Sequence, residues 1–106
     1  MAYIQIQTTF ESQDDAEKLA ELMLDARLVS CGQISEIKSV YNFGSKRYNH
    51  KEYLLTMKTR ADLFLECEAF IRKNHSYKVP QIIATKIEFG SRDYLYWIYE
   101  HTKGRK

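Results

Sequence analysis

Hydrophobic and polar residues alternate near the start of the chain, and this pattern predicts a strand. Over residues 3–10, Ile4 and Ile6 fall on one side, the period of two expected of a strand with one buried face. Residues 11–29 then carry apolar side chains at helical spacing, with charged residues between them. Ser12, followed three residues later by an aspartate, predicts the start of this helix.

Two stretches rich in β-branched and aromatic residues follow. The first, "SCGQISEIKSVYNF", covers Ser30–Phe43, and the second, "KEYLLTMKT", covers Lys51–Thr59. The polar link "GSKRYNH" separates them. This arrangement predicts an antiparallel hairpin whose loop is longer than a tight turn.

The second half of the chain predicts a helix, a strand and a last helix. Residues 61–74 have an apolar stripe at helical spacing, and Thr59 with Asp62 supplies a capping pattern. Residues 79–89 form the fourth predicted strand, and Ser91 opens the last helix, "SRDYLYWIYEH". We expect a single domain over residues 1–106.

The resulting order is β-α-β-β-α-β with an added C-terminal helix. This order is typical of the ferredoxin-like α+β fold, in which right-handed crossovers place both main helices on one face of a four-stranded antiparallel sheet. The other face of the sheet is then either open to solvent or covered by another surface.

The last helix favours self-assembly. Residues 94–99 read Tyr-Leu-Tyr-Trp-Ile-Tyr, so apolar and aromatic side chains point in every direction and one core cannot bury them all. The central strands are also long for this chain, and long edges invite pairing with another copy. The alternative is that the helix docks on its own sheet while the tyrosine hydroxyls remain in water.

Composition narrows the functional classes. The 16 basic and 14 acidic residues among 106 nearly balance and are scattered, which argues against a nucleic-acid or membrane-surface role. Cys31 and Cys67 are too few for a disulfide framework. The N-terminus lacks the features of a signal peptide, and no apolar run is long enough to span a membrane. We therefore expect a cytoplasmic protein.

Residue chemistry alone offers only a weak metal signal. His50, His75 and His101 are far apart, without the spacing of two metal ligands on one element. For His75, directly after a predicted helix, a C-terminal cap is the alternative. The chain has no glycine-rich phosphate loop and no nucleophile with a neighbouring base, so we expect no enzymatic activity. The predicted third strand also lacks the glycine and aromatic pattern of RNA-recognition modules.

Several segments together resemble the CutA family, the divalent-cation tolerance proteins, over almost the entire chain. They read "AEKLAELMLDARLVSCGQI", "SVYNFGSK", "YLLTMKT" and "HSYKVPQIIATKIEFGSRDYLYWI". The family patterns are Leu-x-x-Cys-x-x-Ile, a Lys-Thr pair closing the third strand, His-Pro-Tyr-Glu-x-Pro-x-Ile-Ile, and Tyr-Leu-x-Trp in the last helix. The matching positions here are Leu28, Cys31, Ile34, Lys58, Thr59, His75, Tyr77, Pro80, Ile82, Ile83, Tyr94, Leu95 and Trp97.

The chain also departs from the family pattern. Ser76 stands where the proline usually is, and Lys78 replaces the glutamate. The family's Tyr-Trp-Trp-Glu-Gly-Lys loop is "YNFGSK", which keeps Tyr41 but neither tryptophan. Thr8 stands where some members carry a cysteine proposed as a copper ligand. Only His75 remains of that proposed ligand set.

The resemblance implies a homotrimer of ferredoxin-like subunits, with ligand sites in clefts at the subunit boundaries. It further implies binding of copper or another divalent cation and a role in the response to metal ions. The alternative is a non-catalytic signalling or interaction scaffold, similar in architecture to the trimeric PII proteins, with no physiological metal. The missing cysteine and glutamate slightly favour this alternative.

The resemblance also implies candidate site residues. We expect Tyr41, Glu52, Lys58 and Tyr77 to line the cleft as ligand-binding residues and His75, as a neutral imidazole, to be the metal ligand. The alternative for these residues is interface structure, with Lys58 paired to Glu52 and the tyrosines filling the subunit boundary. The isomer of the Val79–Pro80 bond stays open.

Overall fold

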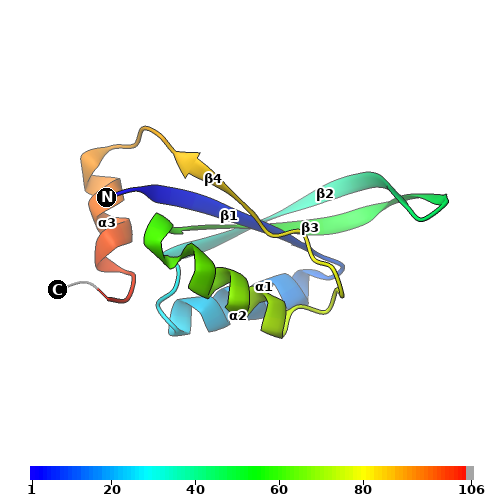
Figure 1. Ribbon diagram of the computed structural model, residues 1–106, viewed down its shortest axis with the longest axis horizontal. Helices are drawn as coiled ribbons and strands as arrows, with labels where there is room; N and C mark the ends of the chain where they lie inside the picture. The colour runs from blue at the N-terminus through cyan, green and yellow to red at the C-terminus, as the bar shows by residue number, and fades with distance from the viewer. Residues whose placement is uncertain (105–106) are drawn as a thin grey trace.

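Figure 1 shows a computed structural model of the chain, which describes residues 1–104. Its sheet has the strand order β2-β3-β1-β4 and is antiparallel throughout. This is the predicted ferredoxin-like α+β arrangement with an added C-terminal helix. The elements are β1 (Tyr3–Phe10), α1 (Gln13–Asp25), β2 (Cys31–Phe43), β3 (Lys46–Arg60), the short 3₁₀ helix η1 (Ala61–Leu63), α2 (Phe64–Asn74), β4 (Ile83–Ile87) and α3 (Arg92–Glu100).

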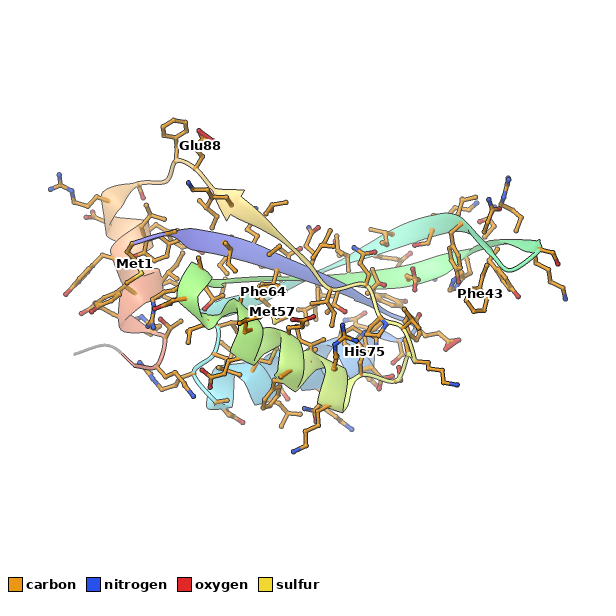
Figure 2. The ribbon with its side chains drawn as sticks, in the orientation of Figure 1. Met1, Phe43, Met57, Phe64, His75 and Glu88 are labelled. Atoms are coloured by element: carbon orange, nitrogen blue, oxygen red, sulfur yellow. The ribbon has the colours of Figure 1, made fainter. Side chains whose placement is uncertain are left out.

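The core lies between the sheet and the two helices that cover one of its faces (Figure 1). Ile6 and Met57 from the sheet are fully buried, as are Met23 of α1 and Ile71 of α2. Met57 lies between sheet and helices in Figure 2. Each buried side chain of this size stabilises the fold by about 1.5–3 kcal/mol. The apolar periodicity of the sequence therefore predicts this layer correctly.

Helix α1 begins as predicted. The Ser12 side chain accepts a hydrogen bond from the backbone amide of Asp15 at 3.1 Å, which satisfies one of the free amides of the first turn. The helix ends at Asp25, where Arg27 adopts a left-handed φ of 56°. Leu28 then turns back into the core, with 3% of its surface exposed.

The hairpin of β2 and β3 is longer than predicted, and its loop is a tight two-residue turn. Phe43 pairs with Lys46 across Gly44 and the following serine, and Gly44 has a φ of 64°, which favours glycine. Residues 46–50, predicted as a link, are instead strand, because alternate aromatic side chains such as Tyr48 pair with β2. The hairpin projects beyond the helices, so the molecule measures 49 × 26 × 21 Å (Figure 1).

The predicted cap of the second helix is wrong. The chain passes from β3 through η1 into α2 without a side-chain cap. The Thr59 hydroxyl instead donates to the carbonyl of Leu28 at 2.6 Å, and Asp62 pairs with Arg60. Thr59 is fully buried on the core side of β3, so its hydroxyl must find a partner there and cannot reach the helix start.

Strand β4 is shorter than the predicted 79–89. It pairs with β1 only from Gln7 to Tyr3, and the next edge carbonyl of β1, that of Thr9, bonds to His75 instead. The segment before β4 is thereby held across the end of β1 rather than added to the ladder. No peptide bond within residues 1–104 is cis, so Val79–Pro80 is trans.

Helix α3 packs across one end of the sheet, beside the N-terminus (Figure 1). Ser91 caps it, with its side chain accepting from the Tyr94 amide at 3.3 Å. Ile98 is fully buried, whereas Tyr96 remains 55% exposed, so one domain does not hide all the aromatic side chains. Of the basic tail, Arg105 and Lys106 lie outside the described residues. None of the helices in residues 1–104 is long and apolar enough to cross a membrane.

Candidate functional site

The face of the sheet opposite α1 and α2, which we call the open face, carries most of the predicted site residues. Side chains alternate between the two faces of the sheet along a strand. Residues of β3 at an odd number of positions from the buried Leu55 and Met57 therefore point to the face away from the core. Glu52 and Lys58 therefore belong to the open face, and Tyr41 reaches it from β2 because it pairs with Tyr48.

Glu52 is a buried carboxylate held by neutral donors. It is 6% exposed, and its Oε1 accepts from the Ser39 hydroxyl at 2.7 Å while its Oε2 accepts from the Tyr77 hydroxyl at 2.7 Å. No Lys, Arg or His within residues 1–104 forms an ion pair with it. Burying a charge without an opposite charge is costly, so this carboxylate is suited to receive a cation.

Tyr77 reaches Glu52 from the connection between α2 and β4. Burial, followed by the hydrogen bond and negative charge of Glu52, raises the pKa of the Tyr77 hydroxyl well above its usual range. The hydroxyl therefore stays protonated and keeps donating to the carboxylate at physiological pH. This contact ties a loop to the sheet across 25 residues of sequence.

Tyr41 and His50 form a second pair beside Glu52. The Tyr41 hydroxyl lies 2.8 Å from His50 Nε2, and the Tyr41 ring also stacks on Tyr48 at 5.6 Å. Ser39 sits directly opposite His50 in the strand register while its hydroxyl bonds to Glu52. These contacts join Ser39, Tyr41, His50, Glu52 and Tyr77 into one group, which we call the Glu52 cluster.

Sequence reasoning missed Ser39 and His50. His50 was assigned to a loop because the hairpin turn was placed too broadly. With the turn at Gly44, the pairing puts position 39 opposite position 50, and the strand period puts 50 and 52 on one face. The signal that could have found them is the alternation of aromatic and polar residues across the tight turn.

His75 lies beside the cluster, at the end of α2, with both ring nitrogens engaged (Figure 2). Nδ1 accepts from the Tyr77 amide at 3.0 Å, which leaves Nε2 to donate to the Thr9 carbonyl at 2.9 Å. The ring stacks on Phe10 with 4.2 Å between centroids. Burial lowers the pKa of His75. This geometry holds a neutral imidazole that positions Tyr77.

Two expectations for His75 change accordingly. The geometry does not favour it as a metal ligand, because a metal ion would have to displace a main-chain hydrogen bond from the ring. The ring also does not cap α2, since it bonds to Thr9 of β1, and the Asn74 side chain bonds the Phe70 carbonyl instead. Within residues 1–104, no group of three or more His, Cys, Asp or Glu residues could hold a metal ion.

Lys58 lies apart from the other predicted residues. It is six positions from Glu52 along β3, or about 20 Å at the rise of a strand. Its Nζ donates to the Gln33 side chain, so the Lys58–Glu52 pair expected as an alternative does not form within one chain. The structure thus brings Tyr41, Glu52 and Tyr77 together and leaves Lys58 at the other end of the open face.

Comparison with known proteins identifies the family. The family model described as CutA1 divalent ion tolerance protein matches residues 4–101. The chain belongs to the CutA family. The resemblance expected from the sequence is therefore confirmed.

Individual CutA proteins are similar to this chain in both sequence and structure. The divalent-cation tolerance protein CutA of Pyrococcus horikoshii is 36% identical over 98 residues, covering 92% of this chain and 96% of the relative. A crystal structure of CutA1 from the same organism aligns with a TM-score of 0.92 at 35% identity, covering 95% of this chain and 99% of that one. CutA1 from Oryza sativa aligns with a TM-score of 0.94 at 30% identity, covering 99% and 97%.

Proposed function

We propose that this CutA-family chain acts in the response to divalent cations as a cytoplasmic, non-enzymatic homotrimer that binds copper or another divalent cation at the Glu52 cluster. The single observation that carries the proposal is the buried Glu52 carboxylate, which has two neutral donors and no cationic partner within residues 1–104. A bound cation would neutralise this charge. The matching family is described as a divalent ion tolerance protein, and divalent ions are the class of ligand proposed here.

Unburied apolar surface supports the assembly. Phe43 lies at the hairpin tip (Figure 2) and is 70% exposed, and Trp97 on α3 remains 36% exposed. Strand β4 lies at one edge of the sheet, and all but the last of its side chains are exposed, so its outer edge can pair with another strand. Subunit contacts through these surfaces would place the Glu52 cluster at a boundary. In the same trimer, Lys58 of one subunit can face a ligand held by another.

The assembly is tested by light scattering at micromolar concentration. A mass near three times the 12.6 kDa of one chain is expected. A mass near one chain would remove the subunit-boundary site.

The cation site is tested by calorimetric titration of metal-free protein with copper and zinc. Glu52→Gln keeps the shape but removes the charge, and we expect it to weaken binding by at least about tenfold. Glu36→Gln is the matched control, because Glu36 is 60% exposed and its ion-pair partner is Lys51. Circular dichroism checks that both variants fold. Equal binding by Glu52→Gln and the parent protein would overturn the site.

A second candidate function is a trimeric signalling or interaction scaffold with no physiological metal. The observation that favours it is His75, whose two nitrogens hold the main chain, so the family position expected to ligate metal is already occupied. The same titration decides between the two functions. If the parent protein binds copper and zinc no more tightly than the Glu52→Gln variant does, the result supports the scaffold function.

A further inference from the structure

His50 and Glu52 lie two residues apart on β3 and share the open face. Side chains at this spacing leave a strand about 6.7 Å apart on the same side. A metal ion bound to an imidazole nitrogen and a carboxylate oxygen stands about 2.0–2.2 Å from each, so two side chains at this spacing can meet at one ion. Ser39 pairs with His50 across the hairpin, and its hydroxyl donates a hydrogen bond to Glu52.

Among the histidines of the chain, His50 is the one whose hydrogen bonding leaves it suited to ligation. His75 holds two main-chain groups, and Nδ1 of His101 bonds the Trp97 carbonyl. Within residues 1–104, the His50 ring has one hydrogen-bond partner, the Tyr41 hydroxyl, which lies 2.8 Å from Nε2, and its Nδ1 has none. It can therefore bind an ion through Nδ1 without losing a main-chain bond.

Tyr41 would then fix the orientation of the His50 ring through Nε2, the nitrogen that does not bind the metal ion. With Nδ1 on a metal ion, Nε2 carries the proton and donates to the Tyr41 hydroxyl oxygen. A second hydrogen bond of this kind is the usual support of a metal-bound histidine, because it fixes the tautomer and the ring orientation. Tyr41 is in turn held by stacking on Tyr48.

The negative charge of Glu52 also favours binding of a divalent ion. Within residues 1–104, Glu52 has no cationic partner, and the neighbouring Lys51 points to the other face, where it pairs with Glu36 at 3.7 Å. A divalent ion would supply the missing positive charge, and its two protein ligands would leave coordination positions for water or the Ser39 hydroxyl. One nitrogen and one carboxylate ligand suit copper and zinc, whereas magnesium and calcium prefer oxygen ligands alone.

We propose that His50 Nδ1 and a Glu52 carboxylate oxygen together bind a divalent ion of the copper and zinc class on the open face. This inference rests on the proposed function, in which Glu52 receives a cation, and adds the second protein ligand. It makes His50, not His75, the metal-binding histidine of this chain.

The test is titration of the metal-free full chain with copper, zinc and magnesium ions, using His50→Gln and the control His101→Gln. Loss of a group that only supports a ligand typically lowers the metal affinity of a site 10–100-fold. Because His50 is proposed as a ligand itself, His50→Gln should weaken copper and zinc binding by at least about tenfold. His101→Gln should bind like the parent, because this exposed histidine lies directly after α3 and its Nδ1 bonds the Trp97 carbonyl. Magnesium should bind more weakly than zinc to the parent protein.

Electron paramagnetic resonance of the copper-loaded protein gives a second readout. The parent should show nitrogen coordination that His50→Gln loses and His75→Gln retains. If Glu52→Gln weakens binding but His50→Gln does not, the histidine ligand is wrong while the proposed function stands. If neither variant weakens binding, both proposals are wrong. Loss of nitrogen coordination in His75→Gln alone would return the site to His75.

Discussion

The hydrogen bond from Tyr77 to Glu52 offers a direct test of how the open face is stabilised. Tyr77→Phe removes one hydroxyl and keeps the ring, while the Tyr77 amide still donates to His75. Glu52 would keep only its bond from Ser39 although it is 6% exposed. A hydrogen bond to a charged group contributes about 1.5–3 kcal/mol, so we expect the free energy of unfolding to fall by about that amount.

The assay is urea denaturation of metal-free protein at one fixed concentration, because assembly makes apparent stability depend on concentration. With a denaturant slope of about 2 kcal/mol per molar, a loss of about 2 kcal/mol moves the midpoint by about 1 M. Tyr96→Phe is the control, since Tyr96 is 55% exposed and its hydroxyl has no hydrogen-bond partner within residues 1–104. Its effect should stay within about 0.5 kcal/mol.

A double-mutant cycle identifies the cause of the loss. In a Glu52→Gln background the acceptor is neutral, so Tyr77→Phe should cost clearly less than in the parent protein. An equal cost in both backgrounds would show that the hydroxyl acts through something other than the Glu52 charge. No cost in the parent protein would refute the reasoning altogether.

Three further predictions follow from the described contacts. Burial lowers the pKa of His75 below its ordinary 6.5, so the unfolded chain takes up a proton first and stability falls as the pH drops below 6.5. Urea midpoints should show this slope, and His75→Gln should flatten it; an unchanged slope contradicts the assignment. Arg60 is 5% exposed and donates to Thr102 and to the Lys103 carbonyl, so Arg60→Met should cost about 1.5–3 kcal/mol and speed amide exchange at both positions. Exchange that is unchanged would show that other contacts hold this end. Gly44→Ala should cost about 1–2 kcal/mol in urea denaturation because Gly44 has a φ of 64°, whereas Gly44→Asn should cost less; equal losses would exclude backbone strain as the cause.

Local patterns predicted most of the fold. Strand β1, the start of α1 at Ser12 and the start of α3 at Ser91 follow the sequence, because alternation, helical spacing and capping act over a few residues. The hairpin turn and the start of β4 did not follow it. Both depend on partners distant in sequence: Phe43 opposite Lys46 closes the ladder, and His75 takes the Thr9 carbonyl that would extend β4.

The site shows the same division. The resemblance to the CutA family led to Tyr41, Glu52 and Tyr77, which the structure brings close to one another. Lys58 and Glu52 share a strand face but lie about 20 Å apart in one chain, a separation that follows from the rise of the strand already predicted over Lys51–Thr59. His50 was missed because its place depends on where the hairpin turns.

By itself, the sequence determined the order of the elements, the core face of the sheet and the family, since hydrophobic spacing and short motifs carry this information locally. Only the tertiary structure decided what each polar side chain contacts. Glu52 is buried because Ser39 from β2 and Tyr77 from a distant loop close over it, and His75 is neutral because β1 and its own loop occupy both nitrogens. Hydrogen-bond partners and desolvation arise from packing between segments far apart in the chain, so no local pattern can specify them.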